Sequence, residues 1–198
     1  MYTNQKAHQK NVIHMDPYEI IKEYYSESSS LYKCLILHSE KVAQKALSCA
    51  KNVDVDQTFI REAALMHDIG IYLTYAPKIS CYGNLPYIFH GYLGMRLLEQ
   101  KGLYRHAQVC VRHVGVGLTI EDIEERNLPL PKMDMQPETL EEQIICYADK
   151  FFSKSENNVE KTIDQILWEL SHYNEKSIEK FMKWHQCFGV SVSKSKAP

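Results

Sequence analysis

Apolar residues recur at steps of three and four along most of this chain, and this period constrains the fold more than any other feature. Between about Ser30 and Lys51 the repeated positions form one helical stripe made of Leu31, Leu35, His38, Val42, Ala46 and Cys49. Such spacing places residues on one face of an α-helix, which must then be buried against other elements. No segment alternates between apolar and polar residues as a half-buried strand would. We therefore expect an all-α protein without a sheet.

Capping residues and helix breakers divide the chain into a bundle of roughly seven to nine helices. Asp16 with Pro17 begins the first helix, Ser28–Ser30 begin the second, and Asp56 begins the third. Residues 71–89 hold prolines and a glycine among tyrosines, which is typical of a structured loop. Further helices are predicted at about 88–101, 104–114, 137–153, 157–171 and 175–186, with a short one capped by Thr119 inside the loop 115–137.

The chain of 198 residues shows no repeat and no linker, so one domain accounts for the pattern. Residues 1–15 and 189–198 are polar and aperiodic. We expect a flexible N-terminal tail at 1–15, a helical domain at 16–188 and a C-terminal tail at 189–198.

The composition excludes several classes of protein. A net charge of −2 does not favour general nucleic-acid binding, which needs a broad basic surface. The start of the chain lacks the apolar segment of a signal peptide, and no stretch approaches the roughly 18 apolar residues of a membrane helix. The six cysteines form no C-x-x-C pair and are expected to be reduced core residues. These features predict a cytoplasmic protein with no membrane association.

Four polar residues interrupt stretches that are otherwise apolar. His38 lies inside the helical stripe, His67 and Asp68 follow the run AALM, and Asp149 stands between IICYA and FF. A buried imidazole or carboxylate is costly without a partner, and one cation shared by all four residues would offset that cost. Such a ligand set suits Mn, Fe, Co, Ni or Zn better than Mg or Ca. The alternatives are a hydrogen-bonded core histidine and a salt bridge between Asp149 and Lys150.

The order and surroundings of these residues resemble the HD superfamily of metal-dependent phosphohydrolases, in the variant whose doublet reads H-D-I-G. The similarity extends from about Leu31 to Ser155 and includes LHSEKVAQKA, AALMHDIG and IICYADKF. The resemblance implies a single HD-domain helical bundle, and it implies four metal ligands: His38, His67, Asp68 and Asp149.

The resemblance also bears on two further histidines. His90 opens HGYLGMRLLEQKG and His113 lies in VRHVGVGLT, where two-metal branches of the superfamily hold a second ion. In that arrangement Asp68 bridges the two ions, so one or two divalent transition metals per chain are expected. A mononuclear site, with His90 and His113 capping helices or facing the substrate, stays open.

The function that the resemblance implies is hydrolysis of a phosphate ester or anhydride by metal-activated hydroxide. Asp68 and His67 are the expected catalytic residues. The expected partner is a small phosphorylated substrate, favoured to be a nucleotide, and a homo-oligomer stays open. Arg112 and Lys150 adjoin ligands in the sequence and are candidates for binding phosphate oxygens, with solvation at the surface as the alternative. Tyrosines of the loop are candidates for stacking on a base, with packing of the loop as the alternative: Tyr72, Tyr75, Tyr82 and Tyr87.

The sequence leaves the substrate open. It has His113-Val-Gly-Val-Gly in place of the H-T-x-G loop of the branch that splits dinucleoside tetraphosphates symmetrically. It also lacks the GYP signature linked to cyclic di-GMP cleavage. Two other classes remain as alternatives: an HD-type di-iron oxygenase and a non-catalytic module that senses a nucleotide.

Overall fold

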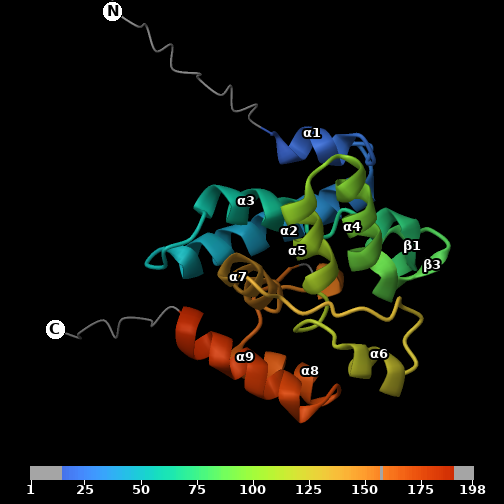
Figure 1. The fold of residues 1–198 in the computed structure, drawn as a ribbon. Helices are drawn as coiled ribbons and strands as arrows, with labels where there is room; N and C mark the ends of the chain where they lie inside the picture. The colour runs from blue at the N-terminus through green and yellow to red at the C-terminus, as the bar shows by residue number, and fades with distance from the viewer. Residues whose placement is uncertain (1–14, 157, 190–198) are drawn as a thin grey trace, which may run out of the picture.

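The computed structural model describes residues 15–156 and 158–189, and helices make up most of this part of the chain (Figure 1). The prediction of an all-α fold with seven to nine helices is confirmed. The described ranges hold nine α-helices: α1 (Pro17–Lys22), α2 (Ser30–Ala50), α3 (Gln57–Met66), α4 (His90–Gln100), α5 (Tyr104–Arg112), α6 (Ile120–Glu125), α7 (Leu140–Asp149), α8 (Ile163–Ser171) and α9 (Glu175–Phe188).

Side-chain caps explain where these helices begin. Asp16, Ser29 and Asp56 each accept a hydrogen bond from a backbone N–H in the first turn of α1, α2 and α3, as their sequence positions predict. Two predicted starts are wrong. The helix expected from residue 137 begins at Leu140 behind Thr139, and the one expected from residue 157 begins at Ile163. In both cases a threonine three residues before a Glu or Gln forms a capping box that defines the start.

A small sheet occupies the segment that the sequence predicted to be a loop without strands. Strand β1 (Thr74–Ala76) pairs antiparallel with β2 (Cys81–Tyr82) and parallel with β3 (Leu85–Pro86). The expectation of no sheet was therefore wrong for this segment. Strands of two or three residues are too short to show a period of two in the sequence.

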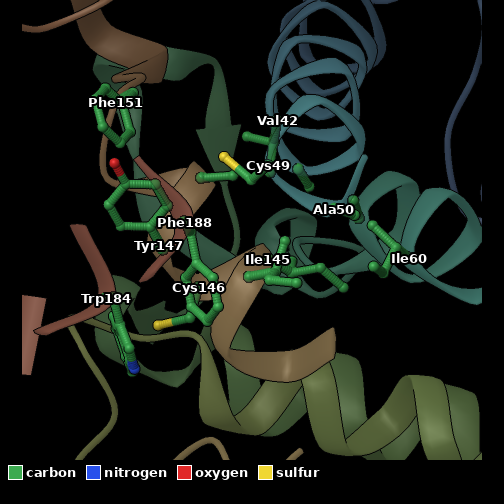
Figure 2. Close-up of a cluster of buried hydrophobic side chains, with 14 of the residues drawn as sticks. Val42, Cys49, Ala50, Ile60, Ile145, Cys146, Tyr147, Phe151, Trp184 and Phe188 are labelled. Atoms are coloured by element: carbon green, nitrogen blue, oxygen red, sulfur yellow. The ribbon is translucent and has the colours of Figure 1, made fainter. Parts of the chain in front are cut away.

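Two clusters of buried apolar side chains form the interior. One lies among α2, α3, α7 and α9, and its residues around Tyr147, Phe151 and Phe188 are drawn in Figure 2. The other joins α1, the start of α2, α4 and α5. Helix α7 runs through the middle of the bundle, with α2 and α3 on one side and α8 and α9 on the other (Figure 1). Four cysteines are buried as predicted, but Cys34 is only partly buried and Cys187 is exposed.

The two predicted tails lie outside the described residues, apart from Met15 and Gly189. Among the helices in the described ranges, none has the length and apolar content needed to cross a bilayer.

Candidate metal centre

Three helices bring the four residues of the first predicted cluster together. His38 lies in α2, His67 caps the C-terminus of α3 with Asp68 directly after it, and Asp149 is the last residue of α7. All four are buried, and one ligand atom from each lies within 4.8 Å of the others. His38 Nε2 is 3.0 Å from Asp149 Oδ1, and His67 Nε2 is 2.9 Å from Asp68 Oδ2. The sequence prediction that these side chains converge agrees with this geometry.

The cluster lies where the two apolar cores meet. Along α2, His38 stands between Leu35 of one core and Val42 of the other. Leu65 and Ile69, on either side of the His67–Asp68 doublet, likewise belong to different cores. The four polar side chains are therefore buried at the junction of the two apolar cores.

Asp68 shares its two carboxylate oxygens between two sets of histidines. Oδ2 lies 3.3 Å from His38 Nε2 and 2.9 Å from His67 Nε2. Oδ1 lies 3.4 Å from His90 Nε2 and 3.5 Å from His113 Nε2. Asp68, His90 and His113 thus form a second buried cluster with its ligand atoms also within 4.8 Å of one another. This is the placement expected of a bridging carboxylate.

Backbone carbonyls fix the orientation of three of the imidazoles. Nδ1 of His67, His90 and His113 donates to the carbonyl oxygen three residues earlier in the chain, each at 2.7 Å. Nδ1 of His38 lies 2.8 Å from Oδ1 of the buried Asn158. A carbonyl oxygen only accepts, so the hydrogen of each neutral ring is on Nδ1 and the lone pair of Nε2 points into the centre. Partners of this kind orient metal-binding histidines in proteins.

Glycines allow α4 and α5 to approach the HD doublet. A Cβ at Gly70 would lie 2.3 Å from the carbonyl oxygen of His90, and one at Gly91 would lie 2.5 Å from the carbonyl oxygen of Cys110. No larger residue fits at either position without moving backbone. The glycine of the H-D-I-G run therefore permits the close contact that brings His90 beside Asp68.

Burial and charge set the protonation of the two clusters. Burial lowers the pKa of His90 to about 3 and lowers that of His113, so both rings are neutral at pH 7. Burial opposes ionisation of Asp68 and Asp149, but the positive groups beside them outweigh it and hold both pKa values well below the usual range. Burial also opposes a charge on His67, yet the Asp68 carboxylate prevails and raises the pKa of His67 to about 9. Both carboxylates of the first cluster are therefore ionised at pH 7.

The donor set fits divalent transition metals. His67 Nε2 and both carboxylate oxygens of Asp68 are buried, and within the described residues they contact charged or imidazole neighbours without a well-aligned hydrogen bond. Nε2 of His90 lies 3.1 Å from Nε2 of His113, so two neutral rings present lone pairs to each other. A cation in each cluster would offset the free-energy cost of the poorly paired buried atoms and of the two facing lone pairs. Mixed imidazole and carboxylate ligands suit Mn, Fe, Co, Ni or Zn.

A cavity of about 750 Å³ opens from this centre. His90, His113 and Asp149 lie in its wall, together with Lys150 and other side chains. Lys150 Nζ lies 3.0 Å from Asp149 Oδ2, so this predicted phosphate contact is beside the centre. Of the four loop tyrosines only Tyr87 lines the cavity; the rings of Tyr75 and Tyr82 are exposed on the small sheet and Tyr72 packs on Tyr24 and Tyr25.

Two residues that contact the centre were not predicted from the sequence. Lys154 Nζ lies 2.5 Å from Asp68 Oδ2 and 3.2 Å from His38 Nε2, and its side chain is largely buried. Asn158 holds His38 from the other side of the ring. Both come from the polar stretch SKSENN after α7, where no apolar period identifies the buried positions.

Arg112 does not face the cavity, contrary to the expectation from sequence. Its guanidinium donates to both oxygens of the buried Glu142 and to Glu138, with N–O distances of 2.7–3.1 Å. Through these contacts of its two terminal nitrogens, Arg112 stabilises the start of α7. Its neighbour His113 points to the centre because successive residues near a helix end project in directions about 100° apart.

The profile of the HD domain family matches residues 35–153, so this chain belongs to the HD family. That stretch contains all six residues of the two clusters. The resemblance seen in the sequence is thereby confirmed.

Three archaeal proteins are similar in sequence. The tRNA (cytidine(56)-2'-O)-methyltransferase of Picrophilus torridus is 30% identical over 152 residues, which is 72% of this chain and 41% of the relative. The enzyme of the same name from Thermoplasma volcanium is 32% identical over 120 residues, covering 60% of this chain and 32% of the relative. An uncharacterized protein of Methanocaldococcus jannaschii is 35% identical over 132 residues, covering 66% and 69%. This chain therefore spans less than half the length of the two methyltransferases.

Solved structures with the same fold include the HD domain of the phosphodiesterase PgpH from L. monocytogenes. It aligns with a TM-score of 0.52 at 16% identity, covering 83% of this chain and 94% of that domain. The same domain in complex with cyclic-di-AMP aligns with a TM-score of 0.51, covering 91% and 99%. At this identity the likeness shows a common fold.

Proposed function

We propose that this protein is a metal-dependent phosphohydrolase that cleaves a phosphate ester or anhydride of a nucleotide or a related small phosphorylated metabolite. The observation that carries the proposal is the pair of buried clusters that share Asp68 beside a lysine-lined cavity. Membership of the HD family supports a metal-dependent phosphohydrolase in general terms. The choice of a nucleotide is the finer part of the proposal.

In this proposal His38, His67, Asp68 and Asp149 would hold one cation, and His90 and His113 would hold a second one together with Asp68. A bound divalent metal supplies Lewis acidity and lowers the pKa of water toward neutrality. The protein contributes imidazoles whose orientation is fixed through Nδ1, and two carboxylates that stay ionised. These side chains keep their donor atoms in place without rearrangement during the reaction.

The cavity supports a phosphorylated substrate of nucleotide size. Its volume of about 750 Å³ lies within the range of small-molecule sites. Lys150 and Lys154 place positive charge in the wall next to the clusters, where they would neutralise phosphate oxygens. Tyr87 and Phe152 supply aromatic surface to the same cavity, which suits a base. The complex of the PgpH HD domain with cyclic-di-AMP makes nucleotides the first compounds to test.

A hydrolysis assay with matched variants tests the proposal. The chelator-treated protein would be loaded with Mn²⁺, Fe²⁺, Co²⁺ or Zn²⁺ and given mononucleotides, dinucleotides and cyclic dinucleotides. We expect metal-dependent phosphate release or cleavage of at least one class, and loss of turnover in Asp68→Asn, which keeps the shape of the residue but removes its charge. Lys132→Met, at an exposed residue that does not line the cavity, is the control.

Two other outcomes would replace the proposal. Metal-dependent oxygen uptake without phosphate release would favour the oxygenase alternative. Tight nucleotide binding by the metal-loaded protein without turnover on any compound would favour the sensing module. A cytoplasmic location and a homo-oligomeric state remain predictions that fractionation and light scattering would test.

A further inference from the structure

Lys154 contacts the same atoms that a cation in the first cluster would bind. Its ammonium lies 2.5 Å from Asp68 Oδ2 and 3.2 Å from His38 Nε2. That oxygen is also the one that faces both imidazoles of the first cluster, at 2.9 Å from His67 Nε2 and 3.3 Å from His38 Nε2. The lysine and a metal ion therefore compete for one carboxylate oxygen and one ring nitrogen.

Lys150 offers a close contrast within the same site. Its ammonium lies 3.0 Å from Asp149 Oδ2. The other oxygen of that carboxylate, Oδ1, is the one that faces the imidazoles, at 3.0 Å from His38 and 3.4 Å from His67. Lys150 therefore holds Asp149 from outside the cluster and can keep its contact when a cation binds. Lys154 cannot.

When it is displaced, the Lys154 side chain can move into the adjoining cavity. Lys154 lies in the short 3₁₀ turn 154–156 in the cavity wall, between Ser153 and Ser155, which line the same cavity. A lysine head sits on a flexible four-carbon stem, so it can move several ångströms while the turn stays fixed. In the cavity it would meet the phosphate oxygens of a substrate bound at the centre.

We propose that Lys154 is an internal counter-ion of Asp68, which a metal ion must displace from the first cluster and which then binds the substrate's phosphate in the cavity. The inference rests on the proposed function, because it requires a cation in the first cluster. Under this proposal, Lys154 lowers the affinity of the protein for the metal and raises its affinity for phosphate. A lysine that only stabilises the fold would support both kinds of binding.

Calorimetric titration of the chelator-treated full chain with Mn²⁺ tests the first half. We expect Lys154→Met to bind Mn²⁺ about tenfold or more tightly than the unmodified protein, because a competing positive charge is gone. Lys150→Met should bind Mn²⁺ equally or less tightly, because Asp149 loses the partner that orients it. Lys161→Met is the neutral control, since Lys161 lines the same cavity but pairs with Glu169, at 2.7 Å.

Titration of the Mn²⁺-loaded proteins with inorganic phosphate tests the second half. Lys154→Met should bind phosphate about tenfold more weakly than the unmodified protein, as expected for loss of a charge-assisted contact. Opposite changes in the two affinities support the proposal. Equal or weaker Mn²⁺ binding by Lys154→Met, or unchanged phosphate binding, would overturn it.

A second variant and the Mn²⁺ binding of the unmodified protein separate misfolding, failure of the proposed function and failure of this inference. Lys154→Gln retains a polar head and carries the same expectations, so misfolding of the methionine variant alone does not decide the question. If neither the unmodified protein nor any variant binds Mn²⁺, the proposed function fails together with this inference. If all bind Mn²⁺ but Lys154→Met gains nothing, only the inference fails.

Discussion

Replacement of Gly70 by alanine should destabilise the protein and disturb the second cluster. A Cβ at this position would lie 2.3 Å from the carbonyl oxygen of His90 and 2.5 Å from the backbone nitrogen of Gly94. Both atoms belong to the backbone of α4, so no side-chain rotation relieves the overlap. The helix must move away from the HD doublet, and His90 moves with it.

The expected loss of stability depends on which atoms the new Cβ overlaps. The φ angle of Gly70 is −84°, so alanine adopts this backbone conformation freely and the whole cost comes from crowding. Adding one methyl group to a well-packed interior costs about 1–3 kcal/mol. Because the neighbours are backbone atoms, we expect about 3 kcal/mol, at the upper end of that range.

Urea unfolding followed by circular dichroism measures the loss, with an unchanged m-value as the check that the unfolding reaction is the same. Gly102→Ala is the matched control. Nothing lies within 4 Å of a Cβ at Gly102, but its φ of +73° is left-handed, so strain alone should cost about 1–2 kcal/mol without affecting metal binding. A Gly70→Ala protein as stable as the unmodified one, or one with unchanged metal content, would show that crowding against α4 does not position His90.

Three further variants probe the centre and its surroundings. Asn158→Ala removes the group that orients His38, and isothermal titration should show Mn²⁺ affinity reduced about 10–100-fold; unchanged affinity would mean that the ring is held by other contacts. The double variant His90→Ala/His113→Ala should lower the metal content measured by plasma mass spectrometry from about two per chain to one, and retention of both metals would rule out the second site. Arg112→Met should lower the free energy of unfolding by about 2 kcal/mol or more, because it leaves a buried glutamate without its partner. A rise in KM without loss of stability would instead assign that residue to the substrate.

The helical fold was predictable because its signals are local. The stripe around His38, the caps at Asp16, Asp56 and Thr119, and the break at Gly102 each act within a few residues. The small sheet was not predictable on that basis, since its strands are held by pairing between segments that are separated by turns.

The six residues of the two clusters were predictable for a different reason. A polar side chain within an apolar stripe must be buried with a partner, so His38 and Asp149 stand out in the sequence itself. His90 and His113 were found only through the resemblance to the HD superfamily, because neither stands out as a polar residue within an otherwise apolar stretch of sequence.

The contacts around the centre were harder to predict. Adjacency to a ligand suggested Arg112, but neighbouring residues on a helix point in different directions, and Arg112 binds the carboxylates of Glu138 and Glu142 instead. Lys154 and Asn158 reach the centre from irregular backbone after α7, where position in the chain does not determine direction. Only the three-dimensional structure identifies such residues as contacts of the centre.

Anomalous diffraction from crystals soaked in Mn²⁺ locates the ions themselves and therefore tests directly whether two metals bind at Asp68. We predict two peaks on either side of the Asp68 carboxylate, one against His38, His67 and Asp149 and the other against His90 and His113. A single peak at the first position would leave a mononuclear enzyme. The absence of any peak within reach of Asp68, in crystals whose protein is intact and whose soak contains the ion, would rule out a metal centre at this site.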